Sequence, residues 1–327
     1  MGEKDYVELL DRFKGSLIGA AVGDALGMPT EEITQDQLDL QFGGKVTGYR
    51  KPGRYHPCNH LEAGQYTDDT QQTIILAESL AEKQGFDLHD FGKRIDEWAY
   101  RCVSEPGYNR FAGCTSLRAG LDIRAGKDPR KVGRQSRSCG AAMRITPIGL
   151  FYHDDHESLV KFAQESASMT HKHPDAIKSA EYVATLVAYL ANGGEPEVSA
   201  YEAFSPIFND QTDLTCNIRR VLRNRKSPPE ELKKYTGSSQ AACETVPMAL
   251  SCFLYSPDDF ETTVINGANL VPGDTDSIAC IAGALSGAHN GIDKIPSKYL
   301  DSLESRKKIE DLAAELFIKS RTRGVLI

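Results

Sequence analysis

The stretch KGSLIGAAVGDALG, residues 14–27, decides how this chain folds. Glycine recurs in it at every fourth position, at Gly15, Gly19, Gly23 and Gly27. Residues four apart lie on one face of an α-helix, so these glycines form a ridge without side chains. Each interior glycine costs a soluble helix about 1 kcal/mol relative to alanine. The row therefore predicts a compensating gain, namely the close approach of a second helix backbone.

A second stretch, IAGALSGAHNG at residues 281–291, repeats the pattern with Gly283, Gly287 and Gly291. We therefore predict that the two glycine-rich helices cross in the centre of the fold. A dimerisation motif of membrane helices uses the same spacing. Asp24 and the absence of a long apolar run argue against that alternative.

The rest of the sequence also predicts helices rather than strands, because apolar residues recur at helical spacing and no alternating runs follow one another. We predict helices over residues 8–27, 70–84, 87–103, 156–170, 175–192, 241–255 and 276–289. Residues 43–66 and 104–140 are predicted loops, and residues 193–240 are the least regular part. No repeat or linker divides the chain, so we expect one all-α domain over residues 1–327.

The composition argues against several classes of protein. With 40% hydrophobic residues among 327, the chain can bury the core of one large domain. A formal net charge of −8 argues against a nucleic-acid duplex as partner. No apolar run reaches transmembrane length and the charged N-terminus lacks a signal-peptide core, so we expect a cytoplasmic monomer without a membrane partner. The eight cysteines form no C-x-x-C pair, and we expect reduced thiols.

Two acidic motifs, YTDDTQ at residues 66–71 and PGDTDS at residues 272–277, each stand where a predicted helix begins. Helix capping explains such residues, but one cap needs only one oxygen. The motifs together supply four carboxylates, from Asp68, Asp69, Asp274 and Asp276. No Lys or Arg stands beside them to balance their repulsion. Hard divalent cations prefer such oxygen ligands, and two ions would balance the four charges.

Five motifs together resemble the ADP-ribosylglycohydrolase family. They are GSLIGAAVGDALGMPTEE, YTDDTQ, SCGAAMRITPIGL, THKHPDAI and PGDTDSIACIAGALSGAHNG, which stand in the family's order between residues 14 and 291. The resemblance implies an all-α orthogonal multi-helix bundle with a metal-containing central cleft. It also implies two Mg²⁺ or Mn²⁺ ions, and hydrolysis of the glycosidic bond between ADP-ribose and its acceptor.

The resemblance carries specific roles over to this chain. It implies as metal ligands Thr67, Asp68, Asp69, Asp274, Asp276 and Ser277. Asp276 then bridges the two ions. Glu31 matches an acidic position that in relatives reaches the metal or the reacting ribose. The proton is expected to be managed by Glu31 or by Asp69.

The pyrophosphate of ADP-ribose needs N–H donors rather than carboxylates. The glycine turn in SRSCGAAMR predicts backbone donors at Ser138, Cys139 and Gly140. Cys139 stands where the family commonly has Asn, so a side-chain contact is not carried over. His171 resembles a phosphate-contacting histidine, and Arg144 is either a salt-bridge partner or a phosphate ligand. The loops that resemble the ribose and adenosine end contain Gly113, Cys114, Thr115, Gly237 and Ser238.

Several alternatives stay open at this stage. A metal-dependent phosphohydrolase of an ADP-ribose-like nucleotide shares the D-x-D pattern, and a non-catalytic ADP-ribose-binding protein shares the cleft. His56, Cys58 and His60 lack a fourth zinc ligand at suitable spacing. Ser138 with His171 suggests a nucleophile but lacks the G-x-S-x-G motif. The acceptor is open among arginine, serine, a nucleic-acid end and an O-acetyl group.

Overall fold

The computed structural model describes residues 2–323, which fold into helices joined by loops, without a sheet in that part of the chain. The predicted all-α class is confirmed. The α-helices are α1 (Glu3–Gly27), α2 (Gln35–Phe42), α3 (Asp68–Lys83), α4 (Leu88–Ser104), α5 (Cys114–Arg124), α6 (Thr146–Phe151), α7 (His156–Ser168), α8 (Pro174–Ala191), α9 (Pro196–Phe204), α10 (Asp213–Arg223), α11 (Pro229–Thr236), α12 (Ala242–Tyr255), α13 (Phe260–Ala268), α14 (Thr275–Asn290), α15 (Ser297–Leu300) and α16 (Arg306–Arg321). None of the described helices is long and apolar enough to cross a membrane.

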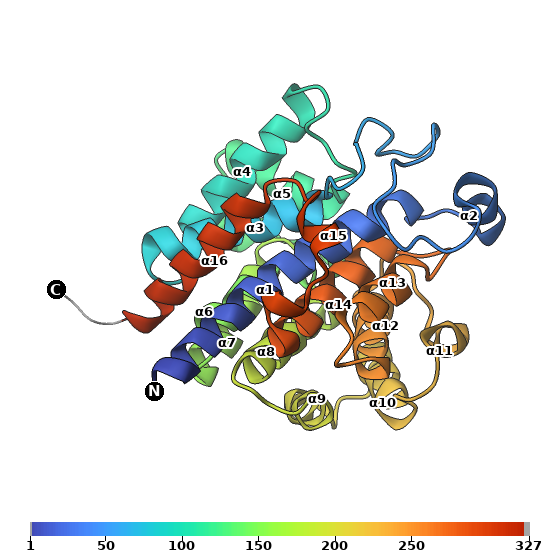
Figure 1. Cartoon of the computed structure of the whole chain (residues 1–327). Helices are drawn as coiled ribbons and strands as arrows, with labels where there is room; N and C mark the ends of the chain where they lie inside the picture. Colours follow the sequence, from blue (N-terminus) through green and yellow to red (C-terminus); the bar gives the residue numbers. More distant parts are fainter. Residues whose placement is uncertain (1, 324–327) are drawn as a thin grey trace.

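The two glycine-rich helices, α1 and α14, pack against each other in the middle of the molecule (Figure 1). Gly15 faces Gly287, and Gly19 faces Gly283. Further along, Gly23 faces Ala279. A Cβ atom added at any of these glycines of α1 would overlap a backbone carbonyl of α14. The close backbone approach predicted from the glycine rows is confirmed, and it extends along most of the length of the two antiparallel helices.

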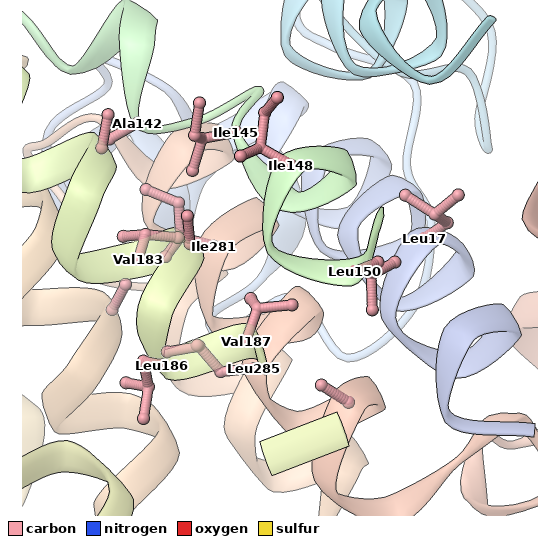
Figure 2. Close-up of a cluster of buried hydrophobic side chains, with 14 of the residues drawn as sticks. Leu17, Ala142, Ile145, Ile148, Leu150, Val183, Leu186, Val187, Ile281 and Leu285 are labelled. Atoms are coloured by element: carbon pink, nitrogen blue, oxygen red, sulfur yellow. The ribbon is translucent and has the colours of Figure 1, made fainter. Parts of the chain in front are cut away.

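A hydrophobic core surrounds this pair. Helices α6 and α8 pack against α1 and α14, and α16 covers another side of α1. Figure 2 shows side chains from four of these helices in the core, including Leu17 of α1, Ile148 of α6, Val187 of α8 and Leu285 of α14. All four side chains are buried. The start of α14, which carries the second acidic motif, is therefore attached to a densely packed core.

The structure contains every predicted helix, with ends shifted by a few residues, most at α1, which begins at residue 3 instead of 8. The predicted loop 104–140 is corrected because it contains α5, and residues 193–240 contain α9, α10 and α11. Pro196 and Pro229 occupy the first turns of α9 and α11. Proline starts a helix there because its missing N–H is not needed in the first turn. Helices α2, α6, α13, α15 and α16 were also not predicted.

Candidate metal and substrate cleft

Asp24 of α1 joins the first acidic motif to the core. Its side chain is fully buried, and its Oδ1 accepts a hydrogen bond from the N–H of Thr67 at 2.9 Å. Its Oδ2 accepts from the N–H and the hydroxyl of Thr70, at 3.0 and 2.6 Å. The first N–H groups of a helix have no partner within it. Asp24 thus supplies to α3 the acceptors that a local cap would supply, and Asp68 and Asp69 are left to face the cleft.

The second acidic motif meets the C-terminal end of α1. The Thr275 hydroxyl donates to the carbonyl of Gly27 at 3.1 Å, and the Thr30 hydroxyl also donates to Gly27. The chain then turns so that Glu31 reaches the second motif. Carboxylate oxygens of Glu31, Asp274 and Asp276 lie within 4.8 Å of one another, as the ligands of a metal ion would.

The capping hypothesis explains only part of these motifs. Thr67 does cap α3, because its hydroxyl accepts from the N–H of Asp69 at 3.4 Å. Asp274 stands at the N-cap of α14 but makes no capping bond. Its Oδ2 instead accepts from the Cys139 thiol at 3.1 Å and from the Thr245 hydroxyl at 2.9 Å. Oδ1 of Asp274 is therefore the oxygen left for a ligand in the cleft.

The two motifs form the floor of one cleft of about 320 Å³. The predicted site residues that line it are Glu31, Asp68, Asp69, Gly113, Cys114, Thr115, Ser138, Cys139, Gly140, His171, Asp274, Asp276 and Ser277. Phe111, Ser136 and Gln240, which were not predicted, line it as well. Segments that lie far apart in the sequence, including both acidic motifs, thus meet around one small cavity.

The structure corrects three details of the predicted substrate contacts. Gly237 and Ser238 do not line the cleft, because Ser238 supports the second motif from behind. Its hydroxyl donates to the Pro272 carbonyl at 2.9 Å, and its carbonyl accepts from the N–H of Asp274 at 2.8 Å. The N–H of Cys139 donates to the Gln240 carbonyl at 2.9 Å, so it does not serve a ligand.

The floor of the cleft is a concentrated patch of buried acid. Burial, followed by repulsion from Asp276, raises the pKa of Glu31 and of Asp69 well above the usual values. Burial and Asp24 raise the pKa of Asp68 to about 7. Glu31 Oε2 and Asp69 Oδ2 are buried and accept no hydrogen bond. Unpartnered buried carboxylate oxygens are expensive, so the donor set fits a divalent cation.

The zinc alternative conflicts with the geometry around His56. Its Nδ1 accepts from the N–H of Cys58 at 3.1 Å, and its Nε2 lies 3.2 Å from the Glu31 carbonyl. Both ring nitrogens are therefore occupied by backbone. The Ser138–His171 pair does exist, with 2.9 Å between Oγ and Nε2. The absence of a sequence motif did not exclude that contact.

Arg144 and Gln72 are functional candidates whose roles the sequence did not reveal. Arg144 is neither a phosphate ligand nor a salt-bridge partner, since it is fully buried behind the cleft and forms no ion pair within residues 2–323. It donates to Gln72, and Gln72 donates to Asp68 at 2.7 Å. The four-residue spacing of Asp68 and Gln72 on α3 allows their contact, but no spacing connects Arg144 to Gln72.

A larger groove, of about 450 Å³, lies beside α3 and α4 and is lined by Tyr66, Trp98 and Tyr108. Its arginines pair with carboxylates, for example Arg110 with Glu304. It lacks the buried, unpartnered oxygens of the smaller cleft, so size does not identify the functional site here.

Comparison with known proteins agrees with this geometry. The family model described as ADP-ribosylglycohydrolase matches residues 5–325. The chain is 30% identical to human ADP-ribosylhydrolase ARH3, over 94% of this chain and 93% of that protein. It is 28% identical to ADP-ribosylarginine hydrolase Tri1 of Serratia proteamaculans, over 95% of this chain and 80% of that protein.

A solved structure titled ADP-ribosylglycohydrolase-related protein complex has a similar fold. It superposes with a TM-score of 0.76 at 28% identity, covering 96% of this chain and 99% of that one. The agreement extends over nearly the whole chain in both sequence and structure. The chain therefore belongs to the ADP-ribosylglycohydrolase family and is an enzyme of the glycosidic-bond hydrolase class.

Proposed function

We propose that this enzyme depends on divalent metal ions and releases ADP-ribose from an acceptor by cleaving the bond at C1 of the distal ribose. One observation carries the proposal: Glu31 Oε2 and Asp69 Oδ2 are buried at the cleft floor without a hydrogen-bond partner. The walls instead carry hydroxyl groups, such as those of Thr115 and Ser138. An acidic floor suits cations that bind a ribose diol, and donor groups on the walls suit a pyrophosphate.

Two ions, Mg²⁺ or Mn²⁺, suit the charge of the floor. The residues proposed to hold them are Thr67, Asp68, Asp69, Asp274, Asp276 and Ser277. When bound, the ions supply Lewis-acid stabilisation of the charge that develops at the ribose and orient a water molecule. The buried aspartates hold their oxygens toward the cleft because the hydrogen bonds of Asp24, Thr245 and Gln72 fix the surrounding backbone and side chains.

Glu31 is the residue proposed to manage the proton. His56 Nε2 donates to the Glu31 carbonyl, and the N–H of Glu32 donates to the Gly273 carbonyl at 3.0 Å. These bonds hold the Glu31 side chain over the second motif. In the hydrolysis, the water oxygen forms a bond to ribose C1 as the bond from C1 to the acceptor breaks. Glu31 Oε2 accepts one hydrogen of the water, and the leaving acceptor gains one hydrogen, so the protons balance.

Product analysis tests the proposal. The relative named ADP-ribosylarginine hydrolase makes an arginine-linked ADP-ribosyl peptide the first substrate to try, beside a serine-linked one. With Mg²⁺ we expect free ADP-ribose, loss of turnover with a chelator, and an unchanged helical circular dichroism spectrum in the metal-free protein. Asp276→Asn should abolish turnover, and Asp259→Asn, at the N-cap of α13, should not. Release of AMP would indicate a phosphohydrolase, and binding without turnover a non-catalytic binder.

A further inference from the structure

Arg144 lies between the two halves of the cleft without lining it. Its Nη1 donates to Gln72 Oε1 at 2.8 Å, and its Nη2 donates to Thr170 Oγ1 at 2.7 Å. Burial lowers the pKa of the guanidinium to about 10, so it stays charged at neutral pH. A buried charge without a counter-ion costs free energy, and its retention calls for a role. Arg144 also donates to Ser116 Oγ and to the carbonyls of Gly140 and Ser166, but only the bonds to Gln72 and Thr170 continue to side chains that bond residues lining the cleft.

Two chains of hydrogen bonds start at Arg144, one through Thr170 and one through Gln72. In the first, the bond to Thr170 determines which atom donates at each following step. An arginine can only donate, so Thr170 Oγ1 must accept from Arg144. A hydroxyl has one hydrogen of its own to give. His171 Nδ1 lies 2.7 Å away, whereas the Ala167 carbonyl lies at 3.5 Å. The shorter contact takes the hydrogen, so Nδ1 of His171 is an acceptor.

The acceptor role of His171 Nδ1 then determines which atom donates between His171 and Ser138. A neutral imidazole whose Nδ1 accepts carries its hydrogen on Nε2. Burial and the charge of Arg144 lower the pKa of His171 to about 3, so the ring is neutral. Nε2 therefore donates to Ser138 Oγ at 2.9 Å. Ser138 then has its own hydrogen to give, either to Ser136 Oγ at 3.1 Å or to an acceptor on a ligand. A histidine that donates to Ser138 cannot activate it as a nucleophile.

In the second chain of hydrogen bonds, the bond from Arg144 to Gln72 determines how the Gln72 amide is oriented. Because Gln72 Oε1 accepts from Arg144, the amide nitrogen faces Asp68 and donates to Oδ2 at 2.7 Å. The N–H of Gly113 approaches the same oxygen at 3.5 Å. Oδ2 of Asp68 is therefore engaged by protein donors, and Oδ1 is the oxygen left for a cation.

We propose that Arg144 is a positioning residue that determines the donor and acceptor roles in both chains of hydrogen bonds. As a result, Ser138 donates to an anionic oxygen of the ligand, and Asp68 presents Oδ1 to a cation. The inference rests on the proposed function for the identity of that anion, the pyrophosphate of ADP-ribose. Arg144 touches neither ligand. It acts through Thr170 and His171 on one side and through Gln72 on the other.

The hydrogen on His171 is directly measurable in the free protein. In histidine labelled with ¹⁵N, we expect the wild-type ring to be protonated on Nε2 at neutral pH, with its signal assigned through His171→Gln. Thr170→Ser should keep this state, because serine offers the same hydroxyl. Thr170→Val should lose the preference, because no group then donates to Nδ1. A wild-type ring protonated on Nδ1 would overturn the proposal.

Binding measurements test the two chains of hydrogen bonds independently. At saturating Mn²⁺, Thr170→Val should weaken ADP-ribose binding about tenfold and leave the Mn²⁺ affinity unchanged. Gln72→Leu should weaken Mn²⁺ binding about tenfold and leave the His171 signal unchanged. Arg144→Lys should weaken both. Thr263→Val, which removes an equally buried hydroxyl from α13, should weaken neither.

Equal losses in both affinities for Thr170→Val, or none, would refute the separation. Failure of the wild type to bind ADP-ribose would refute the proposed function instead. The His171 signal does not depend on that ligand, so it would still decide the direction of the chain.

Discussion

Asp276 occupies the electrostatic centre of the cleft. After burial, it is the largest source of the raised pKa of Glu31 and of Asp69. It also belongs to the close carboxylate group with Glu31 and Asp274. The charge of Asp276 thus acts on carboxyl groups of both motifs. The proposal that Asp276 bridges the ions follows from this position.

Replacing Asp276 by Asn should weaken the binding of both ions. An amide offers one neutral oxygen and cannot easily bridge, so we expect a loss of metal affinity of about 100-fold. Glu31→Gln should keep the metal affinity near that of the wild type and slow turnover about 100-fold or more. Calorimetric Mn²⁺ titration beside turnover assays would distinguish them. Equal metal losses in the two variants would make Glu31 a ligand instead.

At the scale of elements, the cleft depends on how three helix ends are held together. Asp24 connects the end of α1 to the start of α3, and Thr275 connects it to the start of α14. The glycine contacts between α1 and α14 fix how far the two helices can slide. The spacing between the acidic motifs is therefore set by backbone packing and not by the carboxylates, which repel one another.

Gly23→Ala should separate α1 from α14. The added methyl group would overlap the Ala279 carbonyl, and neither backbone can move without disturbing the core. We expect the free energy of unfolding to fall by about 3 kcal/mol. Urea denaturation measures it. Gly48→Ala is the control, because a Cβ there meets nothing within 4 Å and the free energy of unfolding should hardly change.

Asp24→Asn should damage the metal site from a distance. The amide would turn a donor toward the Thr70 N–H and hydroxyl, leaving buried groups unpaired. We expect a loss of about 3 kcal/mol in unfolding free energy and weaker Mn²⁺ binding.

Asp259→Asn is the matched control for Asp24→Asn. Asp259 caps α13 through the same two groups of Thr262, but at the exposed surface. It should cost about 1 kcal/mol without changing Mn²⁺ affinity. Unchanged Mn²⁺ affinity in Asp24→Asn would show that α3 keeps its place without this contact.

The sequence predicted the two glycine-rich helices and the acidic floor because both depend on local patterns. Glycine every fourth residue and carboxylates at helix starts are visible in one dimension. The contacts of Asp24 with Thr67 and of Arg144 with Gln72 depend on which buried groups face one another after folding, and no spacing encodes that. Gly237 and Ser238 were misplaced for the same reason, since their loop turns its hydrogen bonds toward the second motif.

For the whole molecule, the acidic floor makes stability depend on pH and on metal together. The pKa of Asp68 is raised to about 7, and those of Glu31 and Asp69 are raised well above their usual values. The folded, metal-free protein therefore binds more protons than the unfolded chain. This contribution to stability is present at low pH and is lost as the pH rises through these values.

Metal-free protein should accordingly melt at a lower temperature at about pH 8.5 than at about pH 6.5. Mg²⁺ should raise the melting temperature more at the higher pH, because cations replace the lost protons. His171, with its pKa lowered to about 3, is neutral in the fold at both values but partly protonated in the unfolded chain at about pH 6.5. It therefore opposes this trend, by less than the three carboxyl groups promote it. Calorimetric melts with and without Mg²⁺ measure both effects. A metal-free melting temperature that rises with pH would contradict the proposal that the carboxyl groups at the cleft floor bind protons without metal and release them when cations bind.

The pairing of α1 with α14 also has a consequence for synthesis on the ribosome. Gly27 and Thr275, which touch in the finished protein, are 248 residues apart. At about 5–20 residues per second, α1 leaves the ribosome roughly 12–50 s before α14 is made. During that interval its glycine face has no partner and neither acidic motif has its final neighbours. The nascent enzyme therefore acquires its cleft only after α14 has been made, and until then the glycine face of α1 is open to provisional contacts.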